Sequence, residues 1–314
     1  MNGRRRFLLG VAAAGCSRHE DPPSAPPVPP PPPVSASAAP GRVPADERTW
    51  KFPESGVGRM NVVVVVPEHA EGERLPVLIA LHGRGETLKG PERGARGWVD
   101  DYALGRAAER LAHPPLTPAD FENFIEPARL KVLNGALAAE PYRGLIVACP
   151  YLPDVLSNDN PFGGAPPLAR FLVDVLLPRL YAETPALGTP ASTGIDGVSL
   201  GGRAALTVGL LRPEAFGAVA TLQAAFEPDS AREIAERSRQ ALLKNPKLRL
   251  RLLTSSGDYY LRSLSTIHAE LTHAEVPHDY LVVTGPHDYA FNRGPGALEM
   301  LAYHDRVLRG RPPP

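Results

Sequence analysis

A serine stands at the centre of the motif Gly197-Val198-Ser199-Leu200-Gly201. This G-x-S-x-G spacing is typical of a sharp strand-to-helix turn that exposes a nucleophilic serine hydroxyl at its tip. The two flanking glycines are required because side chains there would collide with the adjoining strand and helix. A strand-like stretch precedes the motif and a helical stretch, residues 203–211, follows it. The alternative interpretation is a glycine-rich turn in which Ser199 only caps a helix.

A serine hydroxyl needs a general base, and the base needs an acid that orients it. Asp258 follows a predicted strand at 248–254, and His287 follows another at 280–284. Both residues therefore belong at the carboxyl edge of a sheet, where sites of this kind gather. The order Ser, Asp, His is the order that this motif requires. We interpret Ser199, Asp258 and His287 as a catalytic triad, although a helix cap and a turn histidine are the simpler alternatives.

Acyl transfer also needs donors for the oxyanion that forms at the attacked carbonyl. The turn Leu81-His82-Gly83-Arg84 follows a predicted strand. We expect the backbone N–H groups of Arg84 and Leu200 to form the oxyanion hole. His82 is expected to shape the turn rather than transfer protons. The Arg84 guanidinium could meet an acidic substrate group, but a solvated arginine is the simpler expectation.

Strands and helices alternate along most of the chain. Apolar and β-branched runs predict strands at 60–67, 75–81, 145–149, 193–198, 218–222, 248–254 and 280–284. Apolar residues at helical spacing predict helices at 168–180, 231–243, 261–271 and 297–308. This alternation favours an α/β fold, a mostly parallel central sheet with helices on both faces.

One connection is longer than such a fold needs. About 60 residues separate the strand that ends at Leu81 from the one that starts at Leu145. We assign residues 84–143 to an insertion that is either a lid over the site or a packing element. By location alone, Trp98, Tyr102, Phe121 and Tyr260 are candidates for the pocket wall, and equally for the core.

The first residues have the pattern of an export signal, because three arginines precede a short apolar run. Arg4-Arg5-Arg6-Phe7 resembles the bacterial twin-arginine motif, and Ala13-Ala14-Gly15-Cys16 resembles a lipobox. We predict a signal peptide at 1–15, lipidation at Cys16, a Pro-rich tether at 16–47 and a catalytic domain at 48–314. The protein is then expected to be exported to the bacterial cell envelope, or secreted if Cys16 is not lipidated.

Composition excludes several classes of function. Lys plus Arg and Asp plus Glu both number 34, so a net charge of zero argues against binding to nucleic acid. Two cysteines, Cys16 and Cys149, exclude a disulfide scaffold and argue against a cysteine-based metal site. We therefore expect no metal and no organic cofactor, and contact with a membrane only through Cys16.

Leu81-His82-Gly83, the stretch from Gly197 to Gly202, Asp258 and His287 together resemble the α/β-hydrolase family. Within it they resemble the putative-esterase branch, with esterase D, feruloyl esterases and polyhydroxyalkanoate depolymerases. Residues 212–219 add to a likeness that extends over roughly residues 60–308. The long insertion departs from the family core, and Leu222-Gln223-Ala224-Ala225 replaces the Ser-Gly often found there.

The resemblance implies a serine hydrolase that cleaves a small-molecule or polymeric carboxylic ester through an acyl-enzyme. A peptidase or an acyltransferase could use the same triad, since fold alone does not define function. A catalytically silent hydrolase fold that serves as a binding module is the third alternative.

Overall fold

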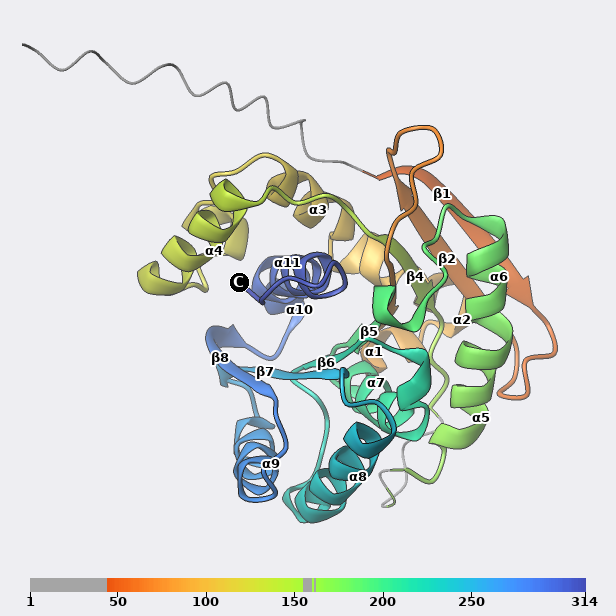
Figure 1. Ribbon diagram of the computed structural model, residues 1–314, viewed down its shortest axis with the longest axis vertical. Coiled ribbons are helices and arrows are strands. Elements are labelled where there is room, and N and C mark those ends of the chain that lie inside the picture. The colour runs from red at the N-terminus through yellow and green to blue at the C-terminus, as the bar shows by residue number, and fades with distance from the viewer. Residues whose placement is uncertain (1–43, 155–159, 161) are drawn as a thin grey trace, which may run out of the picture. The chain divides into compact units, whose positions relative to one another are not determined.

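The computed structural model describes residues 44–154, 160 and 162–314. The predicted export signal, Cys16 and nearly all of the predicted tether lie outside these residues. Eight strands form one sheet in the order β1-β2-β4-β3-β5-β6-β7-β8 (Figure 1). The strands are β1 Pro44–Phe52, β2 Met60–Pro67, β3 Val77–Leu81, β4 Ile146–Pro150, β5 Thr193–Gly197, β6 Ala218–Leu222, β7 Arg249–Gly257 and β8 Asp279–Pro286.

The sheet is mostly parallel, as the sequence predicts. β2 pairs antiparallel with both β1 and β4, and all remaining neighbours pair parallel. The predicted end of the tether at residue 47 is wrong, because β1 begins at Pro44 and Glu47 pairs with Val65 of β2. β1 carries four charged residues at the sheet edge, so it lacks the apolar run that reveals a buried strand.

Helices fill the connections between strands. The α-helices are α1 Arg84–Thr87, α2 Gly90–Gly94, α3 Leu104–Ala112, α4 Pro127–Ala139, α5 Ala165–Arg170, α6 Leu177–Glu183, α7 Leu200–Leu211, α8 Ala231–Lys244, α9 Leu261–His273, α10 Tyr289–Phe291 and α11 Ala297–Val307. Short 3₁₀ turns are η2 Pro118–Phe121, η4 Pro190–Ser192, η5 Pro213–Ala215 and η6 Pro228–Ser230, and π-helical turns are η1 Gly97–Asp101, η3 Phe171–Leu176 and η7 Asn292–Gly296. Within the described residues, no helix has the length and apolar character needed to cross a bilayer.

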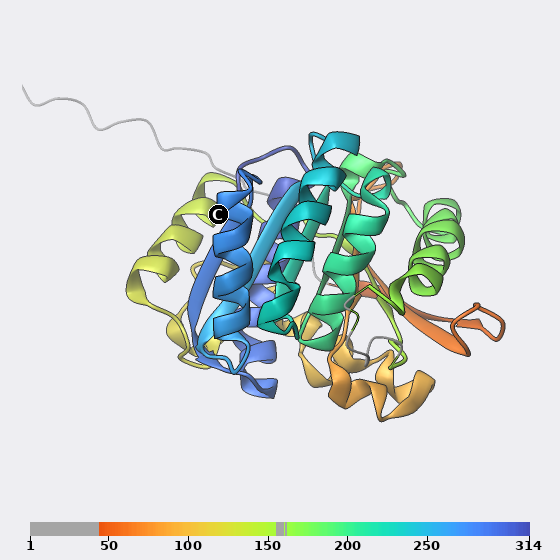
Figure 2. The same cartoon turned by 90° about the horizontal axis from the view of Figure 1, so that it is seen from below.

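Side chains alternate between the two faces of the sheet, and each face has its own core. In β2, Val62 and Val64 join one cluster while Val63 and Val65 join the other. The first cluster lies under α5 to α9, whose helices run along one face of the sheet (Figures 1 and 2). The second lies under α3, α4 and α11 on the opposite face. This double burial explains why the parallel strands are nearly continuous apolar runs.

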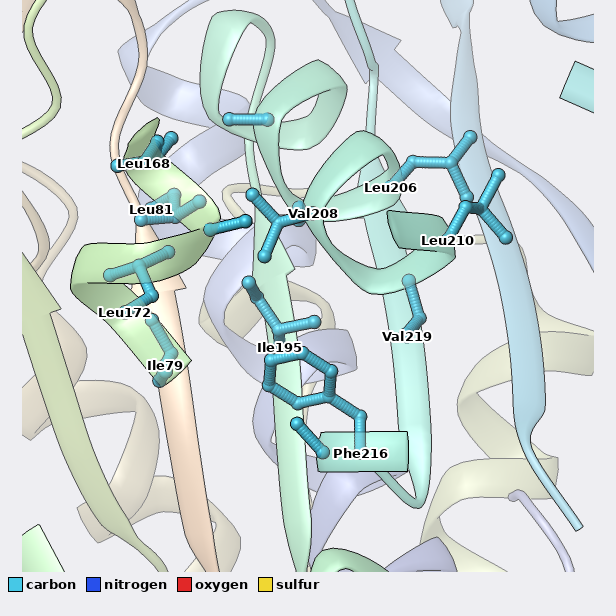
Figure 3. Packing of buried hydrophobic residues seen from close by; sticks show 14 of the residues in the cluster. Ile79, Leu81, Leu168, Leu172, Ile195, Leu206, Val208, Leu210, Phe216 and Val219 are labelled. Carbon is cyan, nitrogen blue, oxygen red and sulfur yellow. The ribbon is translucent and has the colours of Figure 1, made fainter. Parts of the chain in front are cut away.

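The helix that follows the serine motif is held firmly in the first core. Val208 of α7 lies in the same buried cluster as Ile195 of β5 and Ile79 of β3 (Figure 3). All three side chains are fully buried. α7 begins at Leu200, three residues earlier than the helical pattern indicates. The turn between β5 and α7 is therefore mounted on two packed elements.

The predicted insertion, residues 84–143, forms α1, α2, η1, α3, η2 and α4. Trp98, Tyr102 and Phe121 are buried in the second core, so of the two interpretations left open for them, pocket wall or core, the core holds. Their large apolar rings are more stable against the sheet than at a wet surface. α4 is further fixed by Arg129, which forms an ion pair with the buried Glu299 of α11. These contacts make much of the insertion a covering layer for the sheet.

Candidate active site

Ser199 lies at the junction of β5 and α7, in a backbone conformation that favours glycine. Its φ is 57° and its ψ is −116°, which is a strained region for a residue with a side chain. The neighbouring chain enforces this turn. The Ser199 N–H donates to the Leu222 carbonyl at 2.9 Å, and the Ser199 carbonyl accepts from Arg203 and Ala225, both at 3.0 Å. Strain held in this way by surrounding hydrogen bonds is a feature of functional sites.

The two flanking glycines are required by close backbone approach. A Cβ at Gly197 would overlap the carbonyl of Gly201, and a Cβ at Gly201 would overlap the carbonyl of Leu81. Both obstacles are backbone atoms, which cannot move aside as a flexible side chain can. The turn that carries Ser199 is thus packed directly against the end of β3.

Asp258 and His287 are brought together, although 29 positions separate them in the sequence. Asp258 follows β7 and His287 follows β8, so both lie at the carboxyl edge of the sheet. His287 Nδ1 donates to Asp258 Oδ1 at 2.8 Å. Asp258 also accepts from the Thr254 hydroxyl at 2.6 Å and from the Tyr260 N–H at 2.8 Å. Since Nδ1 is engaged, the Nε2 atom of His287 is the one left to exchange a proton.

Two tyrosines enclose the imidazole of His287. The Tyr259 ring stacks on it with a centroid separation of 4.1 Å, and Tyr260 approaches edge-on at 5.6 Å. The His287 side chain is only 9% exposed, whereas Tyr259 is 69% exposed. The packing limits rotation of the ring, which helps to keep Nε2 in one direction. Of the four pocket-wall candidates, Tyr260 is the one whose ring packs against His287.

The turn after β3 holds the first candidate oxyanion donor. Gly83 is the N-cap of α1, and Arg84 and Leu200 are the first residues of α1 and α7. First-turn N–H groups have no acceptor within their own helix, so they are available to an anion. A Cβ placed on Gly83 would lie 3.7 Å from the Ser199 Cβ, which shows how closely this turn approaches the serine. The Arg84 side chain is exposed and pairs with Asp154 at 3.1 Å.

His82 orients this turn. Its Nε2 accepts from the Leu152 N–H at 2.9 Å, so its Nδ1 carries the proton and donates to the Gly83 carbonyl at 2.8 Å. A trans peptide directs its carbonyl and its N–H to opposite sides. Fixing the Gly83 carbonyl therefore fixes the direction of the Arg84 N–H. Burial lowers the pKa of His82 to about 4, so the ring is neutral at working pH.

Sequence reasoning missed Gln223, which is buried at the end of β6. Its side-chain amide donates to Ser255 Oγ at 2.6 Å and to the carbonyl of Pro286 at 2.8 Å. Pro286 directly precedes His287. Gln223 has a φ of 48°, so it occupies a second strained position at the same edge of the sheet. The only signal was its place in a segment that departs from the family pattern.

A second histidine–aspartate pair joins α11 to β5, the strand that leads to Ser199. His304 Nε2 of α11 is 3.1 Å from Asp196 Oδ2 of β5, and both side chains are almost completely buried. This pair has no access to a substrate, so we assign it to packing of α11 on β5. His268 of α9 forms a hydrogen bond with His278, at 2.8 Å. Among the described residues, no three His, Cys, Asp or Glu side chains gather as a metal site would require.

The family model described as putative esterase matches residues 154–290. This range contains Ser199, Asp258 and His287. The search of curated proteins returned no match.

Solved structures share the fold at low sequence identity. A ferulic acid esterase is 16% identical with a TM-score of 0.61, over 83% of this chain and 98% of its own. An S-formylglutathione hydrolase from Staphylococcus aureus is 14% identical with a TM-score of 0.60, over 83% and 99%. A fluorophosphonate-binding serine hydrolase from the same organism is 14% identical with a TM-score of 0.61, over 84% and 99%. The predicted α/β-hydrolase fold is confirmed.

Proposed function

We propose that this chain is a carboxylic ester hydrolase of the putative-esterase type and that it cleaves its substrates through Ser199, His287 and Asp258. The match to the family model and the shared fold support the proposal. One observation carries the assignment of roles. The hydrogen bond between His287 and Asp258 forms at the edge of the sheet where Ser199 is held in a strained turn. The proposed nucleophile, base and orienting acid follow β5, β8 and β7, so all three lie at the carboxyl edge of one sheet.

The reaction begins when Ser199 Oγ attacks the ester carbonyl and His287 Nε2 accepts the serine proton. Asp258 holds the ring through Nδ1 and stabilises its charged form. The carbonyl oxygen becomes an oxyanion, and the backbone N–H groups of Arg84 and Leu200 stabilise it. His287 then gives its proton to the departing alcohol, which leaves an acyl group on Ser199. Water, deprotonated by His287, attacks this acyl group. The bond to Ser199 Oγ breaks, His287 returns the proton to that oxygen, and the acid is released.

The test is hydrolysis of p-nitrophenyl acetate, butyrate and octanoate by the purified protein. Ser199→Ala should lower kcat at least ~10³-fold, because the residual rate then comes only from binding and the oxyanion hole. Ser265→Ala, on the exposed face of α9, is the matched control and should leave the rate unchanged. A fluorophosphonate probe should label the wild-type protein and fail to label Ser199→Ala.

If the folded wild-type protein hydrolyses none of these esters, the proposal of an ester hydrolase is contradicted. Turnover of amide substrates would then favour a peptidase. Faster transfer to an added alcohol than to water would favour an acyltransferase. No turnover together with no labelling of Ser199 would favour a silent binding module.

We also propose export and lipidation, on the sequence of residues 1–16 alone. A bacterial host that expresses the full chain should place it in the membrane fraction and incorporate a fatty-acid label. Cys16→Ser should abolish the label while the protein is still exported. Retention of the label in that variant would exclude Cys16 as the site.

A further inference from the structure

A buried carboxylate lies directly behind the oxyanion turn. Glu86 belongs to α1, and its side chain is 1% exposed. Its Oε2 accepts from the Tyr102 hydroxyl, and its Oε1 accepts from the Tyr289 hydroxyl at 2.6 Å. Burying a carboxylate is costly unless it is paired and hydrogen-bonded. The triad mechanism gives this group no role, so its presence calls for another explanation.

The first of its partners, Tyr102, leads to the oxyanion turn. The Tyr102 hydroxyl accepts the Gly83 N–H at 3.2 Å while it donates to Glu86. The Gly83 carbonyl, on the other side of this residue, is already fixed by the hydrogen bond from His82 Nδ1. Gly83 is therefore held at both of its peptide groups, and Arg84, the candidate donor, follows it directly. Displacing Glu86 would free the Tyr102 hydroxyl and loosen one of these two restraints.

The second partner, Tyr289, leads to the loop of the base. Tyr289 comes two residues after His287 and opens the short helix α10. Its hydroxyl reaches Glu86 because residue 85 is glycine. A Cβ at Gly85 would lie 2.8 Å from that hydroxyl. Glu86 thus joins two segments that are 203 positions apart in the chain.

The charge of Glu86 also needs an account, because a negative group opposes formation of a nearby oxyanion. A Cβ on Gly83 would lie within 4 Å of both Glu86 Oε2 and Ser199 Cβ, so the carboxylate is close to the reaction. Lys89 Nζ lies 3.6 Å from Glu86 Oε1 and 2.7 Å from Asp101. Lys89 and two hydroxyl donors therefore offset the charge while the carboxylate keeps its bonds.

We infer that Glu86 is a positioning residue that holds the oxyanion turn and the loop of His287 at a fixed separation. The inference rests on the proposed ester hydrolase. It assigns to Glu86 no contact with substrate. Its effect passes through Tyr102 to the Arg84 N–H and through Tyr289 to His287. Glu86 and the hydroxyls of Tyr102 and Tyr289 together are called the brace below. Displacing a catalytic group by about 1 Å can lower a rate ~10²-fold, so loss of the brace should have a measurable effect on activity.

The test compares Tyr102→Phe, Tyr289→Phe, both together, and Glu86→Gln with the wild type on p-nitrophenyl butyrate. The two phenylalanine variants keep the ring packing and each removes one arm of the brace. Each should lower kcat about 10-fold with KM changed less than about threefold, because the lost positioning matters in the transition state. Removing both arms should cost less than the product of the single effects, because one carboxylate joins them.

The matched control is Tyr181→Phe, which removes a hydroxyl bond of 2.7 Å to Thr193 at the far end of β5. It should leave kcat unchanged. Folding is checked by melting temperature, and the phenylalanine variants test the inference even if Glu86→Gln does not fold. Values of kcat within about twofold of wild type for both phenylalanine variants would overturn it, since a single lost hydroxyl contact that matters costs more.

Failure of the brace and failure of the ester hydrolase are separable. If the wild type cleaves no ester, the proposed function fails, and the rate of labelling by the fluorophosphonate still reports on the brace. That rate should fall in each phenylalanine variant and stay constant in Tyr181→Phe. An active wild type with unchanged phenylalanine variants overturns only the role of Glu86.

Discussion

Gln223 donates a hydrogen bond from its side-chain amide to the carbonyl of Pro286, across 2.8 Å. The residue before Gln223, Leu222, accepts the N–H of Ser199 at 2.9 Å. The end of β6 therefore contacts Ser199 on one side and the loop that precedes His287 on the other. Glu86 joins the oxyanion turn to the same loop from the opposite direction. The segments that carry the proposed chemistry are braced by side chains that take no part in it.

The first prediction concerns Gln223. Gln223→Ala should lower kcat about 10-fold, because the Pro286 carbonyl loses its nearer donor, at 2.8 Å, and keeps only the Ser255 hydroxyl at 3.5 Å. The loop that carries His287 then gains freedom. Ser255→Ala is the matched variant. It removes the other partner of the same amide, at 2.6 Å, and the longer 3.5 Å bond from the Ser255 hydroxyl to Pro286. The 2.8 Å bond from the Gln223 amide to Pro286 is left in place. We expect Ser255→Ala to retain most of its kcat. Equal losses in the two variants would show that the Pro286 bond is not the important one.

The second prediction concerns the glycines. Gly201→Ala should fail to fold or should be destabilised by more than about 3 kcal/mol, because its Cβ would overlap the carbonyl of Leu81. Gly135→Ala is the control, since a Cβ there meets nothing within 4 Å. Gly135 lies inside α4, so that change should stabilise the protein by about 0.5–1 kcal/mol. Urea unfolding measures both, and a mild effect of Gly201→Ala would contradict the crowded turn.

Local signals were enough for every strand of the sheet except β1 and for the chain order of the proposed triad. β2 reads MNVVVVVP, and a run of β-branched residues predicts a buried strand whatever surrounds it. The motif around Ser199 specifies its own turn, because the glycines are needed where they stand. Asp258 and His287 follow strands whose boundaries are visible in the sequence, and the parallel sheet then brings those ends to one edge.

Other parts of the site depend on contacts that no local pattern records. In the sequence, Glu86 is an ordinary acidic residue at the start of a helix. Its role depends on a hydrogen bond from Tyr289, which is 203 positions away. In the same way, His304 is an ordinary helical histidine in the sequence. Its pairing with Asp196 spans 108 positions and appears only in the fold. β1 was missed for a different reason. An edge strand is paired on one side only, so charged side chains replace the apolar run.

The third prediction concerns the ion network that anchors α4. Glu299 is 1% exposed and pairs with Arg129 at 2.6 Å and with Arg251 at 2.7 Å. Glu299→Gln should destabilise the protein by about 3–5 kcal/mol, because two guanidinium groups then lose their counter-charge in the interior. Glu233→Gln is the control. That residue pairs with Arg237 on the exposed side of α8, and its change should cost less than about 1 kcal/mol.

The fourth prediction concerns His82 and the dependence of stability on pH. Burial lowers the pKa of His82 from 6.5 to about 4 in the folded protein. The unfolded chain therefore binds a proton between these values while the folded protein does not. The contribution of His82 to the free energy of unfolding should be fully present above pH 6.5. It should be lost as the pH falls toward 4, which lowers the stability by about 3 kcal/mol in all.

His82→Asn isolates this contribution, because asparagine does not titrate and keeps a donor for the Gly83 carbonyl. The variant will be less stable at pH 7, since Leu152 N–H loses its acceptor, but its stability should depend less on pH between 6.5 and 4. Urea unfolding at pH 7, 5.5 and 4.5 measures the difference between the two proteins. If the difference in stability does not change with pH, His82 binds its proton equally in the folded and unfolded states. It would then be protonated in the folded protein over the lower part of this pH range. Its Nε2 could then no longer accept from Leu152, and the arrangement by which His82 is proposed to orient the Arg84 N–H would have to be different.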